Sequence, residues 1–252
     1  MSDKSRPLAD KVALITGASR GLGRAIARRL ADDGAAVIVN YRSDEGEANS
    51  LVEAIERSGG KAIAVQADVV DSAAVSSLFQ QAVDAYGGID IVVANAGVEL
   101  IDTPITEIDD AAHDSVTRIN VYGTFYTLRE AARHVRDDGR VIVISSTTTL
   151  VPNAGFTAYA GSKAAGKLYV ETLAQELGPR GITVNSVIPG PLGDAGVLRD
   201  APDEAKADMA SLSPFGRMGR SGDIDGVVAF VAGPDAGWIS GQHIVANGAA
   251  KI

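Results

Sequence analysis

Short runs rich in Val and Ile recur along the chain, separated by segments of helical length, and this alternation limits the fold more than any other feature. The runs mostly do not alternate with polar residues, which is typical of strands covered on both faces, as in a parallel sheet flanked by helices. Repeated strand–helix units with right-handed crossovers form a doubly wound α/β sheet. The predicted strands are 11–16, 36–40, 61–66, 89–95, 140–145, 182–187 and 243–246.

The segments between these runs predict helices on both faces of the sheet. In one of them Val170, Leu173 and Leu177 fall at positions i, i+3 and i+7, which makes an apolar helical face. Glycines such as Gly139 and Gly181 stand where a helix should end and a strand begin. The predicted helices include 22–33, 44–58, 72–86, 112–136, 157–178 and 221–232.

The chain of 252 residues has no composition break that would mark a linker, so we expect one domain over 1–252. Residues 190–220 depart from the strand–helix rhythm, because they carry three of the nine prolines and no strand pattern. Long excursions of this kind are often functional. We expect a loop or helical lid that contacts the substrate at 190–214, named here the lid segment.

Charge and composition exclude several classes of protein. The chain has 23 basic and 32 acidic side chains, a net charge of −9, which argues against a nucleic-acid partner. It has no cysteine, and its three histidines lack ligand spacing, so we expect no metal site. No apolar run approaches the ~18 residues of a membrane span, and the first ten residues lack the apolar stretch of a signal peptide. These features predict a cytoplasmic protein without a membrane partner.

A glycine-rich turn, TGASRGLG at 16–23, joins the first predicted strand to the first predicted helix. Glycines at such a turn let the backbone approach a pyrophosphate, whose charge is favoured at the helix N-terminus. The spacing is G-x-x-x-G-x-G, and a purely structural turn is the alternative. The turn favours dinucleotide binding, with Gly17, Ser19, Arg20, Gly21, Leu22 and Gly23 as candidate contacts.

The second predicted strand ends without a carboxylate. In dinucleotide-binding folds an acidic residue at this place binds the ribose 2′-hydroxyl of NAD, while an arginine accommodates the 2′-phosphate of NADP. Here the sequence reads Tyr41-Arg42-Ser43, and Arg20 of the glycine turn can reach the same place. Two arginines around a hydroxyl suit a phosphate, so we expect NADPH in preference to NADH. The alternative is a pair of solvated surface arginines.

Tyr159 and Lys163 are four residues apart in a predicted helix, so they share one face. A lysine ammonium beside a phenol stabilises the phenolate and lowers the tyrosine pKa. Ser146 stands just past a predicted strand and can hydrogen-bond the same substrate oxygen as Tyr159. Taken alone, a Tyr–Lys pair at this spacing is usually a surface pair.

The glycine-rich turn, Ser146 and the Tyr159–Lys163 pair follow one another as in the short-chain dehydrogenase/reductase family, which the chain resembles from about Asp10 to Gly248. Residues 94–97 (ANAG) resemble the family's NNAG motif, and Pro189-Gly190 resembles its nicotinamide-side turn. The resemblance implies a Rossmann-type parallel sheet of about seven strands and, commonly, a homotetramer. It also implies cofactor contacts at Asp68, Val69, Asn95, Ala96, Gly97, Pro189, Gly190 and Leu192, together with Tyr159 and Lys163.

The resemblance further implies a role for each residue of a catalytic tetrad. Tyr159 would be the general acid/base, and Ser146 would polarise and orient the carbonyl. Lys163 would lower the tyrosine pKa and bind the nicotinamide ribose, while Asn120 would hold a water that links Lys163 to solvent.

Two positions depart from the family pattern. The first Asn of NNAG is Ala94, which weakens a possible strand tether. A threonine that usually hydrogen-bonds the carboxamide is replaced by Asp194. The carboxylate could accept from the carboxamide NH₂, or the local loop could be rearranged.

Together these features predict an NADPH-dependent oxidoreductase that reduces a small-molecule ketone to a secondary alcohol, with Tyr159 as the proton donor. The substrate could be a 3-oxoacyl thioester, a smaller ketone or a sugar. The acidic lid segment, where only Arg199 and Lys206 are basic, weakens the version with a carrier protein. An NAD-preferring alcohol or sugar dehydrogenase is one alternative. A non-catalytic dinucleotide-sensing scaffold is another, against which the intact tetrad speaks.

Overall fold

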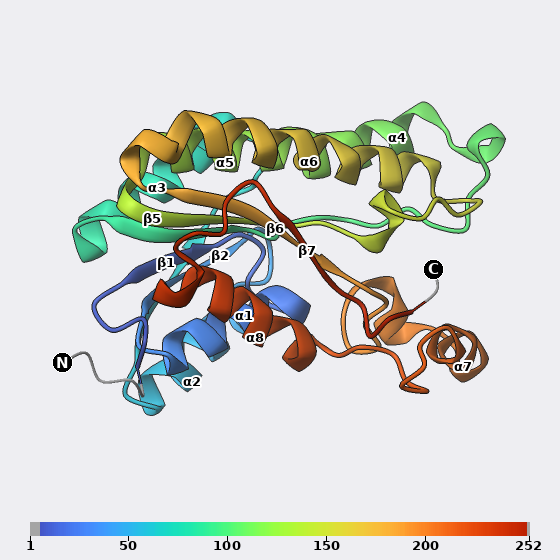
Figure 1. The fold of residues 1–252 in the computed structure, drawn as a ribbon, viewed down its shortest axis with the longest axis horizontal. Coiled ribbons are helices and arrows are strands. Elements are labelled where there is room, and N and C mark those ends of the chain that lie inside the picture. The colour runs from blue at the N-terminus through green and yellow to red at the C-terminus, as the bar shows by residue number, and fades with distance from the viewer. Residues whose placement is uncertain (1–5, 251–252) are drawn as a thin grey trace.

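Seven parallel strands form one sheet with helices on both faces in the computed structural model, which describes residues 6–250 (Figure 1). The predicted doubly wound fold is confirmed. The strand order is β3-β2-β1-β4-β5-β6-β7, so the chain leaves β1 on one side and returns on its other side at β4. Such a reversal opens a crevice at the carboxyl ends of the strands. The strands are β1 (Val12–Ile15), β2 (Ala36–Tyr41), β3 (Lys61–Gln66), β4 (Ile89–Ala94), β5 (Val135–Ile144), β6 (Thr183–Pro189) and β7 (His243–Ala246).

Side chains of one strand enter two separate cores. Ala13 and Ile15 of β1 belong to the core on one face, whereas Val12 and Leu14 belong to the core on the other. All four are buried, because successive residues of a strand point to opposite faces and both faces are covered. This arrangement explains why the strand runs carry no polar alternation.

The helices form two layers. One face carries α1 (Gly21–Asp32), α2 (Glu45–Arg57) and α8 (Ser221–Ala232), and the other carries α3, α5 and α6 (Figure 1). The helices of this second face are α3 (Ser72–Tyr86), α5 (Thr124–His134) and α6 (Thr157–Leu177). Two shorter helices, α4 (Asp110–Thr117) and α7 (Asp203–Ser211), lie at the edge of the fold.

One predicted boundary is wrong. The single helix expected over 112–136 is divided into α4, a π-helical turn over Arg118–Gly123 and α5, and β5 begins directly after α5. Val135 pairs with Ile89, and the pairing shifts before the strand continues. Gly139 therefore lies inside β5 and not at its start. A Cβ on Gly139 would lie 2.7 Å from the backbone oxygen of Asp90, so the irregular stretch requires glycine.

The lid segment contains helix α7 and a 3₁₀ turn over Gly196–Asp200. Its start is held by the backbone N–H of Gly193, which donates to the carbonyl of Gly219 at 2.9 Å. A Cβ on Gly21 of the glycine-rich turn would lie 3.6 Å from the Cβ of Ala195. The lid segment therefore runs next to the predicted dinucleotide site.

Within residues 6–250 no helix is both long and apolar enough to cross a membrane. The expectation for the first ten residues falls partly on 1–5, outside the described part of the chain. The predicted single domain over 1–252 likewise includes 1–5 and 251–252, which lie outside it.

Candidate active site

The predicted catalytic residues come from three elements next to the carboxyl end of the sheet. Ser146 follows β5, Tyr159 and Lys163 lie on α6, and Asn120 lies in the π-helical turn between α4 and α5. Tyr159 and Asn120 are buried, with 7% and 3% of their surface exposed. The fold thus brings together groups that are up to 43 positions apart in the sequence.

Ser146 and Tyr159 interact through their hydroxyl groups. Burial raises the pKa of Tyr159 well above its usual value, the charge of Glu99 raises it further, and Ser146 lowers it. The phenol is therefore protonated at neutral pH, which is the form of a proton donor. Ser146 is itself oriented by Thr148, whose backbone N–H and hydroxyl donate to its Oγ at 3.3 and 3.0 Å.

Lys163 projects from α6 toward the end of β5. Its Nζ donates to the carbonyl of Ile144 at 3.1 Å and lies 6.0 Å from the centroid of the Tyr159 ring. Burial lowers the pKa of Lys163 to about 8, and the charge of Glu99 opposes this fall. Burial has the largest effect on the pKa of the Tyr159 phenol. The lowering of that pKa by Lys163 stays a prediction.

The buried amide of Asn120 joins the end of β4 to α6. Its Oδ1 accepts from the N–H of Val98 at 2.9 Å, and its Nδ2 donates to the Val98 carbonyl at 2.8 Å and to the Ser162 hydroxyl at 2.9 Å. The Ser162 hydroxyl donates in turn to the carbonyl of Tyr159 at 2.7 Å. Sequence reasoning missed Ser162, whose one signal was its place beside Lys163.

Gly97 makes room for the two polar side chains behind it. A Cβ there would lie 3.0 Å from Nζ of Lys163 and 3.2 Å from Oδ1 of Asn120. Any larger residue would push the lysine or the amide out of place. The glycine of the ANAG motif therefore has a packing role in the site.

The glycine-rich turn adopts the conformation that its sequence predicts. Gly17 and Gly21 have positive φ angles of 62° and 54°, which favour glycine. A Cβ on Gly23 would lie 2.3 Å from the carbonyl oxygen of Gly17. Helix α1 starts here without a side-chain cap from Arg20, so its first backbone N–H groups have no capping partner. This cradle fits the pyrophosphate of a dinucleotide, which helix N-termini attract.

Three polar residues hold this turn, and sequence reasoning missed two of them, Thr16 and Asn40. The hydroxyl of Thr16 accepts from the N–H groups of Asn95 and Ala96 at 3.0 and 3.1 Å. Asn95 Nδ2 donates to the carbonyls of Thr16 and Gly17 at 2.9 and 3.1 Å. Oδ1 of Asn40 accepts from the N–H of Gly17 at 3.1 Å. The turn is thereby tied to both β2 and β4.

The end of β2 presents free positive charge. Tyr41 is buried, whereas Arg42, Ser43 and Arg20 are exposed. Neither guanidinium forms an ion pair with another residue in the described part of the chain. Both remain available to an anionic group.

Two of the predicted cofactor contacts, Asp68 and Val69, follow the end of β3. Oδ1 of Asp68 accepts from the N–H of Val70 at 3.2 Å, which fixes the turn. Val69 is buried, and a Cβ on Gly123 would lie 2.7 Å from its Cγ2. The π-helical turn that carries Asn120 therefore packs directly on this part of the predicted dinucleotide site.

The nicotinamide-side residues follow β6. Pro189 ends the strand, and a Cβ on Gly190 would lie 2.8 Å from the Cβ of Asn247, so the two segments touch. Leu192 is buried and pairs with Gly219 in an isolated bridge.

Asp194 serves to cap a helix. Its carboxylate accepts from the N–H of Ser221 at 2.9 and 3.0 Å and from the Ser221 hydroxyl at 3.1 Å. The carboxylate at this position therefore engages the start of α8.

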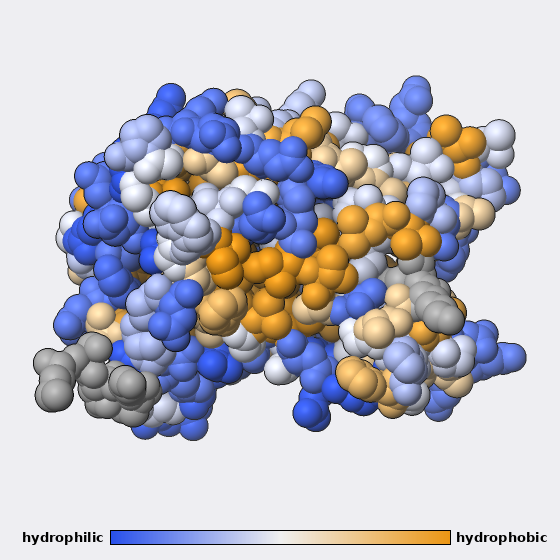
Figure 2. Space-filling view, viewed as in Figure 1, coloured by the Kyte–Doolittle hydropathy of each residue, from blue (hydrophilic) through white to orange (hydrophobic). Residues whose placement is uncertain are grey.

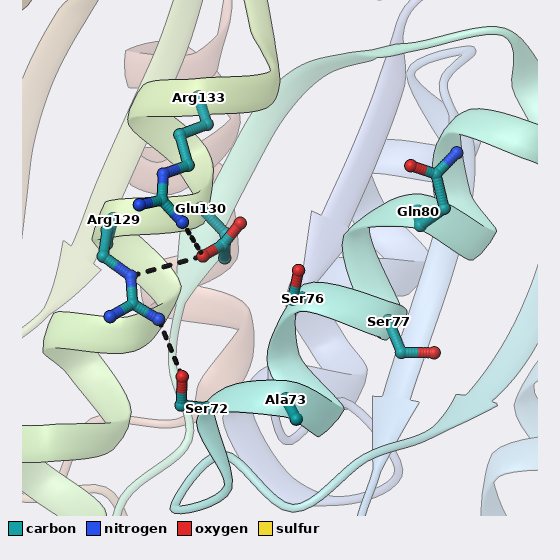
Figure 3. Close-up of a pocket in the computed structure, with 8 residues that line it drawn as sticks. All are labelled: Ser72, Ala73, Ser76, Ser77, Gln80, Arg129, Glu130 and Arg133. Atoms are coloured by element: carbon teal, nitrogen blue, oxygen red, sulfur yellow. Dashed lines mark hydrogen bonds and ion pairs between the residues drawn. The ribbon is translucent and has the colours of Figure 1, made fainter.

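A separate hollow lies between α3 and α5 (Figure 3). Nε of Arg129 and Nη1 of Arg133 contact Oε1 of the buried Glu130 at 3.3 and 2.8 Å, and Arg129 also donates to Ser72 at 2.8 Å. The contact between Arg129 and Ser72 joins the two helices, whereas the contacts of Glu130 lie within α5. None of the predicted site residues lines this hollow.

The sequence matches known proteins over nearly its whole length. A family model described as enoyl-(acyl carrier protein) reductase matches residues 17–249. An uncharacterized oxidoreductase of Methylorubrum extorquens is 42% identical over 97% of this chain and 99% of its own. Versicolorin reductase of Emericella nidulans is 41% identical over 99% of this chain and 98% of its own.

Solved structures with the same fold include several reductases. A dehydrogenase/reductase from Sinorhizobium meliloti has a TM-score of 0.92 at 39% identity and covers 98% of both chains. A short-chain dehydrogenase from Burkholderia cenocepacia in complex with NADP has a TM-score of 0.90 at 38% identity, covering 98% of this chain and all of its own. The angucycline C-6 ketoreductase LanV with bound NADP has a TM-score of 0.91 at 35% identity and covers 98% of both chains. From its sheet, its ordered motifs and these relatives, the chain belongs to the short-chain dehydrogenase/reductase family.

Proposed function

We propose that this protein is an NADPH-dependent carbonyl reductase that converts a ketone to a secondary alcohol. The observation that carries the proposal is the grouping of a protonated Tyr159 with Ser146 and Lys163. The ANAG motif joins this group to the glycine-rich turn, because Ala96 lies against Gly17 and Gly97 lies against Lys163. The names of the similar versicolorin reductase and of the NADP-bound ketoreductase support the same class of reaction. The nicotinamide of the dinucleotide would supply the hydride.

The chain's own residues handle the substrate oxygen and its proton. As hydride arrives at the carbonyl carbon, negative charge develops on the oxygen, and hydrogen bonds from Ser146 and Tyr159 stabilise it. Tyr159 then gives its phenolic proton to this oxygen. A secondary alkoxide is a much stronger base than a phenolate, so a phenol with a raised pKa still protonates it. The net reaction consumes one ketone, one NADPH and one proton, and releases the alcohol and NADP.

Lys163 and Asn120 act as supports in this proposal. The Lys163 ammonium faces the tyrosine ring and would bind the nicotinamide ribose, and after proton transfer its charge stabilises the phenolate. Asn120 holds the Tyr159 segment of α6 through Ser162. The proton of Tyr159 is then restored from solvent.

The dinucleotide contacts follow from the fit of the cradle. The uncapped start of α1 would hold the pyrophosphate, and Arg20 and Arg42 would bind the 2′-phosphate that distinguishes NADPH from NADH. Pro189 and Gly190, which resemble the family's nicotinamide-side turn, would hold the nicotinamide. The lid segment beside the glycine-rich turn would close over the substrate.

We further propose that copies of the chain assemble into a homotetramer. Figure 2 shows an apolar band across the face that carries β7, where Val245 is 46% exposed. Leu168 on α6 and Phe125 on α5 are also exposed. Contiguous apolar surface that is exposed often marks a protein–protein interface.

The test follows NADPH absorbance while the purified protein meets a panel of ketones, with NADH in parallel. We expect NADPH-dependent consumption and an alcohol product. Tyr159→Phe should lower turnover by about 10² to 10⁴-fold and keep NADPH binding. Preference for NADH would favour the alcohol or sugar dehydrogenase. NADPH binding without turnover would favour the dinucleotide-sensing scaffold. Reduction of an enoyl compound's C=C bond, with ketones untouched, would contradict carbonyl reduction.

A further inference from the structure

A carboxylate that the predicted mechanism does not use lies against the lid segment. Glu99 follows the ANAG motif, and its Oε2 accepts the backbone N–H of Val197 at 2.6 Å. Val197 belongs to the 3₁₀ turn of the lid segment. The carboxylate thus lies between the end of β4 and the lid segment.

The lid segment is shaped to approach this carboxylate. Gly196 has a φ angle of 62°, and a Cβ on it would lie 2.5 Å from Oε2 and 2.9 Å from Oε1 of Glu99. No side chain fits at this distance without a shift of the carboxylate. The hydrogen bond from Val197 holds the carboxylate beside Gly196, where the lack of a side chain leaves room for it.

The charge of Glu99 reaches the groups that would bind the substrate carbonyl. It raises the pKa of Tyr159 and opposes the burial that lowers the pKa of Lys163. Gly97, two residues before Glu99, lies against Nζ of Lys163. A charged group on a substrate bound at Tyr159 would therefore also lie in the field of Glu99.

The cations of the lid segment do not pair with this charge. In the described part of the chain no Lys, Arg or His forms an ion pair with Glu99. Arg199 of the lid segment pairs with Asp200 at 2.9 Å, and Lys206 donates to the carbonyl of Arg199 at 2.8 Å. The lid segment therefore offers Glu99 no cation, and the charged group that feels its field is Lys163.

We infer that Glu99 is a specificity-determining residue, whose fixed negative charge selects uncharged ketones over ketones that carry a carboxylate or phosphate close to the carbonyl. The inference rests on the proposed carbonyl reduction and narrows its substrate class. At an effective dielectric constant of about 20, repulsion between two unit charges several ångströms apart lowers affinity by roughly ten- to a hundredfold.

The test compares a matched pair of substrates, ethyl acetoacetate and acetoacetate, which differ in one negative charge. Glu99→Gln keeps an oxygen that accepts from Val197 and removes the charge. We expect wild type to prefer the ester, and Glu99→Gln to raise the acid-to-ester ratio of kcat/KM about tenfold or more. High salt should narrow the wild-type preference and leave that of the variant nearly constant.

Glu53→Gln on the exposed surface of α2 is the matched control, because it changes the net charge equally. We expect its acid-to-ester ratio to equal that of wild type. An equal rise in this control, or an unchanged ratio in Glu99→Gln, would overturn the inference.

A binding experiment separates this inference from the proposed function. Calorimetry measures the affinity of ethyl 3-hydroxybutyrate and of 3-hydroxybutyrate for each protein in the presence of NADP. A shift in the affinity ratio with Glu99→Gln supports the inference even where no ketone is reduced. An unchanged ratio, or no binding of either compound, contradicts it.

Discussion

The carboxylate of Asp194 accepts both hydrogen bonds that Ser221 donates, from its backbone N–H at 2.9 Å and from its hydroxyl at 3.1 Å. Ser221 begins α8, so the contact satisfies a backbone donor at the start of a helix and places a negative charge near the positive end of its dipole. One residue thereby couples the lid segment to a helix that packs on the sheet.

Removal of this cap should destabilise the protein. Replacing a capping side chain with alanine costs about 0.5–2 kcal/mol, and we expect Asp194→Ala to lower the free energy of unfolding by that amount. Urea denaturation followed by circular dichroism measures the change. Asp208→Ala on the exposed face of α7 is the control and should unfold like wild type. Equal midpoints for Asp194→Ala and wild type would show that the cap contributes nothing.

Burial of Lys163 predicts a pH-dependent stability. The pKa falls from 10.5 when unfolded to about 8 when folded, so between these values the unfolded chain binds more protons and stability rises with pH. Above the unfolded pKa the titration of Lys163 costs the folded state nothing. The cost to the free energy of unfolding grows as pH falls and is complete below about 8.

Lys163→Met removes this titration. We expect the free energy of unfolding of wild type to gain about 2 kcal/mol relative to the variant between pH 8 and 9.5. Above pH 10 the raised pKa of Tyr159 acts in the opposite direction, because the unfolded phenol ionises first. Denaturant titrations of both proteins at several pH values measure the difference. Parallel curves for the two proteins would contradict the lowered lysine pKa.

Arg42 should discriminate between the two dinucleotides. It is exposed at the end of β2, and hydrogen bonds between a charged donor and a phosphate contribute about 1.5–3 kcal/mol. We expect Arg42→Ala to weaken NADPH binding by roughly ten- to a hundredfold and to leave NADH binding unchanged. Fluorescence titration measures both affinities, with Arg57→Ala at the far end of α2 as the control. Undiminished NADPH affinity in Arg42→Ala would refute the 2′-phosphate assignment.

Ser162 supports the site through Asn120. Ser162→Ala leaves Nδ2 of the buried Asn120 without one of its acceptors, which costs about 1–3 kcal/mol. We expect a lower melting temperature and a lower kcat, because the α6 segment with Tyr159 loses this tether. Ser76→Ala, at an exposed position of α3, is the control. A melting temperature and kcat equal to those of wild type would show that Asn120 does not act through Ser162.

The fold and the main site residues could be predicted because their signals are local. Apolar strand runs, the glycine-rich turn and the Tyr159–Lys163 spacing each reflect geometry within one or two elements. Structure was needed for Thr16, Asn40 and Ser162, because a buried polar residue has a role only through partners far away in the sequence.

The misplaced boundary near 134 has a similar cause. The helical pattern continued through the region, while the pairing of Val135 with Ile89 drew the chain into the sheet before Gly139. At Ala94 the chain lacks the first Asn of the NNAG motif, and Asn95 and Thr16 tie the end of β4 to the glycine-rich turn.

A strand that is apolar on both faces has no hydrophobic reason to prefer one register. A shift of β1 by one position would exchange Ala13 and Ile15 with Val12 and Leu14 and still bury apolar side chains on each side. A polar contact at the start of β1 favours one register instead, since Oδ2 of Asp90 accepts the N–H of Val12 at 2.9 Å. Alignment of the glycine-rich turn with the rest of the crevice thus depends on a buried carboxylate at the opposite end of the sheet.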